Sequence, residues 1–316
     1  MPTSFAPARP APDRTRSDLL LFLGVAFAVS WGSWGAAMGI GGPAANGEPA
    51  YVPFLFGAFG PLIGALVIRI RRRRRGEPVP AHAVRFRAAT ALLWTPPLMV
   101  LASATVLGAA VLGHAAGDPA LSWEGAEDAM KSMGGPAAFL VSMLLSGPLS
   151  EEPGWRGTAY PRMRATMGRF RIGLTLGVIW AVWHLPLFFI DGTVQNGLGL
   201  ASPGGVLFAV SNIPMAMLVS SAYERAGVVA SIAVHFAVNT TMILLDVHSP
   251  VTQALIIGVQ AAVVTVLLAT GRRSAASPSG SPTGTPTVVA EADGRPKQSG
   301  LTPDRPGNPS PGPLPR

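Results

Sequence analysis

"LLSGPLSEEPGWRGTAY", residues 144–160, places two carboxylates and a guanidinium at the end of an apolar stretch. The apolar part, residues 136–150, contains no charged side chain and is typical of a membrane-spanning helix. Ionisable side chains at membrane depth are expensive unless they find partners, and they usually face the interior of a helix bundle. We therefore expect Glu151, Glu152 and Arg156 to make polar contacts inside the protein.

The composition of the whole chain is that of a membrane protein. Hydrophobic residues make up 49% of the 316 residues, charged residues only 13%, and the mean hydropathy is +0.39. Several stretches of about 18 or more residues are nearly free of charge, and each is long enough to cross a hydrocarbon core of about 30 Å. The sequence predicts an all-α, polytopic transmembrane bundle in the cell membrane. The absence of cysteine excludes disulfides, thiolate metal sites and cysteine nucleophiles.

Hydropathy predicts eight spans, and the charges of the loops between them predict their orientation. Basic loops alternate with neutral or acidic ones, which places both termini in the cytoplasm. The net charge of +8 comes from short basic clusters beside apolar segments, so we interpret it as a topology signal and expect no nucleic-acid partner. The predicted spans are residues 18–40, 52–70, 89–113, 136–150, 172–190, 204–222, 226–246 and 251–270.

Two histidines lie inside predicted spans, in "IWAVWHLPLFF" and "SIAVHFAVNTT". His184 is about 18 Å and His235 about 14 Å from the cytoplasmic start of its span, at 1.5 Å per residue. Glu151 falls about 8 Å short of the inner edge of its own span. All three side chains are thus predicted in the cytoplasmic half of the membrane. A single buried histidine commonly bridges two helices, but three polar positions at one depth favour a functional site.

Spacing along the helices indicates which side chains act together. His235 and Asn239 are four residues apart, so they share a helix face and can act on one point. Trp180 and His184 have the same spacing, which places an aromatic ring one turn from the imidazole of His184.

The two adjacent acids cannot point the same way, because consecutive helical residues diverge by about 100°. Glu152 lies four residues before Arg156, which favours an ion pair if the helix continues through Pro153 and Gly154. Glu151 then remains available to face the histidines.

A carboxylate opposite two imidazoles and an amide has a direct chemical use. Glu151 can act as a general base on water. His184 and His235 can orient that water, bind a divalent metal or stabilise an oxyanion, and Asn239 can donate a hydrogen bond to the same oxyanion. Water attacking an amide carbonyl within the membrane is intramembrane proteolysis.

Three motifs in this order resemble those of the CAAX prenyl protease and bacteriocin-processing (CPBP, or Abi) family of intramembrane proteases. They are "EEPGWRG" (Glu151–Gly157), "WAVWH" (Trp180–His184) and "HFAVN" (His235–Asn239), with "YPRM" and "AYERAG" as further matches. The resemblance covers about residues 135–245. It implies a CAAX-type endopeptidase whose substrate is a membrane-associated or prenylated peptide or protein.

The resemblance also implies roles for individual residues. Glu151 becomes the catalytic base, with His184, His235 and Asn239 completing the site. Glu152, Arg156 and Trp180 become supporting residues. Members of the family are called metalloproteases, yet a metal-free glutamate mechanism is also considered. Zn²⁺ is therefore a possible cofactor, with His184, His235 and Glu151 as candidate ligands.

The predicted organisation has five parts: a disordered segment at 1–17, an N-terminal transmembrane region at 18–134, a CPBP-like protease core at 135–245, a last span at 246–273 and a disordered tail at 274–316. Two other functions remain open. One is a non-catalytic membrane scaffold or immunity protein of the same fold. The other is a proton-coupled transporter, although such proteins commonly contain repeated halves, and we find no internal repeat.

Overall fold

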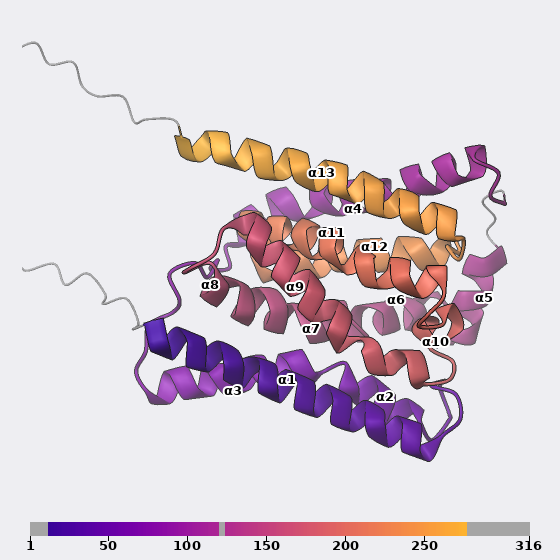
Figure 1. Cartoon of the computed structure of the whole chain (residues 1–316), viewed down its shortest axis with the longest axis horizontal. Helices are drawn as coiled ribbons and strands as arrows, with labels where there is room; N and C mark the ends of the chain where they lie inside the picture. The colour runs from indigo at the N-terminus through magenta and orange to yellow at the C-terminus, as the bar shows by residue number, and fades with distance from the viewer. Residues whose placement is uncertain (1–11, 120–123, 277–316) are drawn as a thin grey trace, which may run out of the picture. The chain divides into compact units, whose positions relative to one another are not determined.

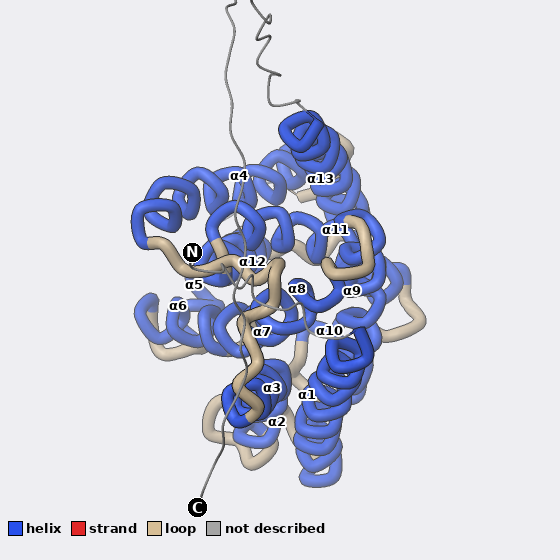
Figure 2. Tube along the Cα trace, turned by 90° about the vertical axis from the view of Figure 1, so that its left-hand side faces the viewer, coloured by secondary structure: helices blue, strands red, loops and turns tan. Residues whose placement is uncertain are grey.

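The computed structural model describes residues 12–119 and 124–276, and within these ranges every regular element is helical (Figure 2). The predicted all-α class is confirmed. In chain order (Figure 1), the elements are α1 (Pro12–Ile40), α2 (Tyr51–Gly57), α3 (Gly60–Arg74), α4 (Ala88–Ala115), α5 (Glu124–Ser132), α6 (Pro136–Leu145), α7 (Pro148–Gly154), the π-helical turn η1 (Trp155–Ala159), α8 (Tyr160–Met163), α9 (Arg169–Trp183), the 3₁₀ helix η2 (Leu185–Phe189), α10 (Val194–Leu198), α11 (Pro203–Ala226), α12 (Val228–Leu244) and α13 (Pro250–Ala276).

The described helices make this chain a multi-pass membrane protein. Five of them are long and apolar enough to cross a membrane, and the number rises to seven if each of two bent helix pairs forms one span. The bent pairs are α2 with α3 and α5 with the segment from α6 to α8. Helix α12 is apolar but shorter, at 17 residues. Each of the eight predicted spans overlaps a helix, but the number of crossings and the cytoplasmic position of the termini stay predictions.

The expected span at residues 136–150 is not one continuous helix. Helix α6 ends at Leu145, and α7 begins at Pro148 after an extended residue, Gly147, with φ of −162°. Proline disfavours helical geometry in the residue before it, which explains a break at this position. Glu151 therefore lies in the first turn of a short second helix, where its N–H donates to the Gly147 carbonyl at 2.8 Å.

Helix α7 packs between α3 on one side and α12 on the other, and α12 packs in turn against α4 and α11. Gly154 permits the approach of α3, because a Cβ at this position would lie 2.6 Å from both Cβ and the carbonyl oxygen of Pro61. Gly177 does the same between α9 and α11, since its Cβ would lie 2.6 Å from the Cα of Ile213. Small residues commonly bring membrane helices together in this way.

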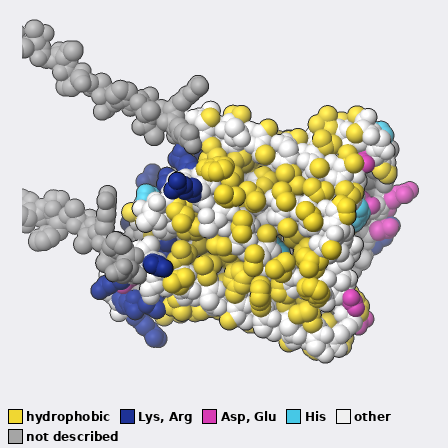
Figure 3. All heavy atoms as spheres, viewed as in Figure 1, with side chains coloured by type: hydrophobic (Ala, Val, Ile, Leu, Met, Phe, Trp, Pro, Cys, Tyr) yellow, Lys and Arg dark blue, Asp and Glu magenta, His cyan; other side chains and the backbone are white. Residues whose placement is uncertain are grey.

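Charged side chains gather at opposite ends of the described bundle (Figure 3). In this view most Lys and Arg lie at the left-hand end, most of the visible Asp and Glu lie at the right-hand end, and hydrophobic side chains cover the face between them. This separation agrees with the alternation of basic and acidic loops in the sequence.

The observed ends of α1 and α13 differ from the expected boundaries of the two terminal segments. Helix α1 begins at Pro12, so residues 12–17 are helical, and α13 continues to Ala276, three residues into the expected tail. The rest of both expected disordered segments, residues 1–11 and 277–316, lies outside the described residues.

Candidate active site

The Glu151 carboxylate is buried, with 3% of the residue exposed, and two tryptophans hold one of its oxygens. The indole N–H of Trp180, on α9, donates to Oε2 at 2.6 Å. The indole N–H of Trp155, on η1, donates to the same oxygen at 3.3 Å. The carboxylate is therefore fixed in orientation, and its second oxygen, Oε1, remains for another partner.

The space beside Gly147 is bounded by Oε1 of Glu151 and by the imidazole of His235. A Cβ built on Gly147 would lie 3.4 Å from Oε1 and 3.6 Å from Nε2 of His235. The backbone at the break between α6 and α7 thus leaves room next to both functional atoms. Glycine provides that room because it has no side chain.

Glu152 links the arginine to the second histidine. Its Oε1 accepts a hydrogen bond from Arg156 at 2.9 Å and one from Nδ1 of His235 at 2.9 Å. All three side chains are buried. Arg156 also donates to the carbonyl of Ala216 at 3.3 Å, and its guanidinium lies 4.7 Å from the centre of the Trp180 ring. The ion pair expected from the spacing forms, whereas the contact between Glu152 and His235 was not foreseen.

Hydrogen bonds to the protein show that Nδ1 carries a proton in both imidazoles. A carbonyl oxygen can only accept, so Nδ1 of His184 carries the proton that it donates to the Trp180 carbonyl at 2.8 Å. Nδ1 of His235 likewise donates to the carboxylate of Glu152. In both rings, Nδ1 is thus engaged by an acceptor, and Nε2 is the nitrogen left for another partner.

His184 is half-buried and lies among aromatic rings. The ring centroids of Trp183 and Phe208 are 4.8 and 5.4 Å from its own. Trp180 stands next to both histidines, with its centroid 5.7 Å from His184 and 5.1 Å from His235. The aromatic neighbour expected one turn before His184 is present, and it also contacts Glu151 and His235.

Asn239 lies one turn after His235 on α12 and is half-buried. Its side chain makes no hydrogen bond within the described part of the chain, so its amide remains free for a ligand. This is compatible with the role expected for it but does not test it.

The irregular backbone after Glu152 places Trp155 and Arg156. Residues 155–159 form a π-helical turn, and Thr158 Oγ1 donates to the Pro153 carbonyl at 3.0 Å. Such turns relieve a proline inside a helix and are frequent at functional sites. Trp155 is buried, and its indole donates to Glu151. The four-residue spacing of this pair was the available signal in the sequence.

The prediction of a zinc ion concerns His184, His235 and Glu151. Among the residues that the structure describes, no three His, Asp or Glu side chains are placed together to hold an ion. Glu151 already accepts two indole hydrogen bonds, and His235 is directed towards Glu152 by its Nδ1. Zinc binding by His184, His235 and Glu151 stays a prediction.

Comparison with known proteins points to one family. Residues 133–241 match a family model described as "Type II CAAX prenyl endopeptidase Rce1-like". A segment of 60 residues is 35% identical to CAAX prenyl protease 2 of Methanococcus maripaludis, which amounts to 19% of this chain and 21% of the relative. The match thus spans about a fifth of the length of that relative. The matched family region contains Glu151, His184, His235 and Asn239.

Proposed function

We propose, from the premise that this chain belongs to the CPBP family through its Rce1-like residues 133–241, that it is an intramembrane endopeptidase. Its substrate is a membrane-associated peptide or protein with a prenylated, CAAX-like end. Glu151 is the general base that activates the attacking water.

The observation that supports this proposal most strongly is the position of Oε1 of Glu151. The oxygen lies with Nε2 of His235 beside a glycine, while Oε2 is held by two indoles. A base that is held in one orientation needs no rearrangement before it accepts a proton, and such preorganisation lowers the barrier of a reaction.

The reaction proceeds in two steps, and the proton that Glu151 accepts in the first step is returned in the second. Glu151 takes a proton from water as the water oxygen bonds to the scissile carbonyl carbon. The resulting tetrahedral intermediate collapses by breaking the C–N bond, and the amine leaves with the proton that Glu151 returns. General acid–base catalysis of this kind contributes about 10²–10⁴-fold.

The remaining residues orient groups around this carboxylate. His235 presents Nε2 to the water, because its Nδ1 is bound to Glu152. Asn239 donates a hydrogen bond to the carbonyl oxygen as it becomes negative. His184, held by the Trp180 carbonyl directly after α9, presents its own Nε2 to the substrate.

The proposal is tested by hydrolysis in proteoliposomes. The purified protein is incubated with a farnesylated CAAX peptide and with the same peptide lacking the lipid, and the products are identified by mass spectrometry. We expect cleavage of the farnesylated peptide at a higher rate. If neither peptide is cleaved, and membrane proteomes of cells with wild type and Glu151→Ala are identical, the proposal fails and a non-catalytic scaffold becomes the better account.

A further inference from the structure

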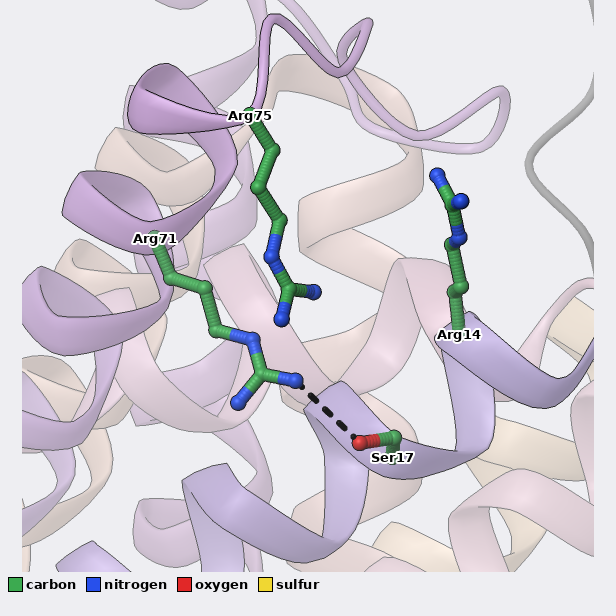
Figure 4. A pocket seen from close by; sticks show the side chains of 4 residues that line it. All are labelled: Arg14, Ser17, Arg71 and Arg75. Atoms are coloured by element: carbon green, nitrogen blue, oxygen red, sulfur yellow. Dashed lines mark hydrogen bonds between the residues drawn. The ribbon is translucent and has the colours of Figure 1, made fainter.

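An open hollow of about 540 Å³ lies between the start of α1 and the end of α3, apart from the carboxylate site. Its lining is three arginines and a serine: Arg14 and Ser17 from α1, Arg71 from α3, and Arg75 directly after α3. Figure 4 shows the side chains converging on the space between the two helices, with the guanidinium groups of Arg14 and Arg75 on opposite sides of it.

Two of the lining residues are held in place by neighbours. Arg71 Nε lies 3.2 Å from the carboxylate of Asp18, which is buried, and its terminal nitrogen donates to Ser17 Oγ at 3.3 Å. Ser17 therefore keeps its own O–H for a ligand. Arg71 thus provides one fixed cationic group in the wall of the hollow, while Arg14 and Arg75 are more exposed.

The positive charge around the hollow exceeds the negative charge. The carboxylates beside it are Asp18 and Glu77, against six arginines, which are Arg14 and the five of residues 71–75. Glu77 lies 3.6 Å from Arg14 and 3.7 Å from Arg75, so it is shared between them at long range. Most of the N–H donors of these two arginines are left for an anion.

A second hollow of about 330 Å³ adjoins the first, since Arg71 and Arg75 line both. Its other lining residues are Val67, Ile70 and Arg74. Ile70 is 50% exposed on a helix that belongs to a candidate membrane span. The wall therefore changes from cationic to apolar along α3, which matches a ligand with an anionic head and a hydrocarbon tail.

Three other arginines of the described chain are already engaged by partners within the protein. Arg164 and Arg169 both pair with Glu224, at 3.2 and 2.6 Å, and Arg162 is buried against Asp18 and the Thr158 carbonyl. The donors of these three arginines are thus directed to acidic groups and carbonyls of the protein, whereas those of Arg14 and Arg75 meet only Glu77 at long range.

We propose that this hollow binds an anionic phospholipid, with the phosphate between Arg14, Ser17, Arg71 and Arg75 and an acyl chain along Val67 and Ile70. Arginine is suited to phosphate because its planar guanidinium donates two parallel hydrogen bonds. Basic residues close to a membrane surface also attract anionic lipids, at about 1 kcal/mol each.

The test uses the full-length protein in detergent and native mass spectrometry with phosphatidylglycerol, phosphatidylcholine or inorganic phosphate as the added probe. Arg14→Gln/Arg75→Gln removes two cationic donors that are 64% and 44% exposed at their side chains, so the fold should persist. Arg85→Gln/Arg87→Gln is the control, because it removes the same charge from exposed positions in the segment between α3 and α4.

We expect wild type and control to bind phosphatidylglycerol more tightly than phosphatidylcholine. In the hollow variant, the apparent affinity for phosphatidylglycerol should fall about thirtyfold, which corresponds to about 2 kcal/mol. If both double variants bind phosphatidylglycerol equally, the lipid is attracted by the basic surface as a whole and the proposed site is wrong. Inorganic phosphate that binds wild type as tightly as the lipid would overturn the role of the apolar wall. Binding of no probe by wild type would overturn the proposal entirely.

Discussion

Two regions of this molecule pair arginine with glutamate, and the pairs differ in burial, in distance and in the other groups that share the carboxylate. At Glu152 and Arg156 the side chains are almost fully buried, the distance is 2.9 Å, and His235 shares the carboxylate. At Glu77 the partners are Arg14 and Arg75 at 3.6 and 3.7 Å, with guanidinium groups that face solvent. The comparison teaches that the same two residue types support a rigid site in one place and a ligand surface in the other.

The largest effect is expected from breaking the buried pair. Arg156→Ala leaves the Glu152 carboxylate without its cationic partner inside the bundle, which should cost about 3–5 kcal/mol of folding free energy. The measurement is the melting temperature and the folded yield in detergent. Glu152→Met/Arg156→Met removes both charges and should recover much of the stability without recovering activity. An unchanged melting temperature in Arg156→Ala would show that the pair contributes little.

A smaller effect is expected from filling the space beside Glu151. Gly147→Ala puts a methyl group at ordinary contact distance from Oε1 and from Nε2 of His235, so we expect a folded protein with cleavage reduced about 100-fold. Gly157→Ala is the matched control, since its Cβ would meet only the Glu152 carbonyl and Val228, at 3.8 and 3.9 Å. Equal activity in the two variants would contradict the placement of the attacking water beside Gly147.

Loss of one indole donor should cost less. Trp180→Phe keeps a ring near Arg156 but removes the 2.6 Å hydrogen bond to Glu151, and kcat should fall about tenfold, in the range of a hydrogen bond to a charged group. Trp183→Phe is the control, because the buried indole N–H of Trp183 has no partner among the described residues. If both variants lose activity equally, the effect comes from packing and not from the hydrogen bond.

The exposed pair should give the smallest effect on stability. Arg75→Gln removes a solvent-facing partner of Glu77, and exposed ion pairs are worth about 0–1 kcal/mol. The melting temperature in lipid-free detergent should therefore stay close to that of wild type. A loss as large as that of Arg156→Ala would remove the distinction between the two regions.

The sequence was most informative where residue spacing alone determines a contact. Hydropathy predicted the helical class, and the i, i+4 rule predicted both the pair of Glu152 with Arg156 and the ring of Trp180 next to His184. Each of these contacts lies within one local segment, so no knowledge of the tertiary arrangement was needed.

The contacts that the sequence did not predict cross between segments or depend on backbone breaks. The bond from His235 to Glu152 joins residues 83 apart, and the bond from Trp180 to Glu151 joins residues 29 apart. The break at Gly147 and the π-helical turn from Trp155 depend on how prolines are accommodated within the packed bundle. Hydropathy averages over such features, which is why residues 136–150 were expected to be one span.

The role of Glu151 is tested most directly by the rate of peptide cleavage with Glu151→Gln in proteoliposomes. The amide oxygen can still accept from Trp155 and Trp180, so the variant should fold and melt like wild type. It cannot accept the proton of water, and the rate should fall at least about 100-fold. A folded Glu151→Gln protein that cleaves within about tenfold of the wild-type rate would contradict the assignment of Glu151 as the base.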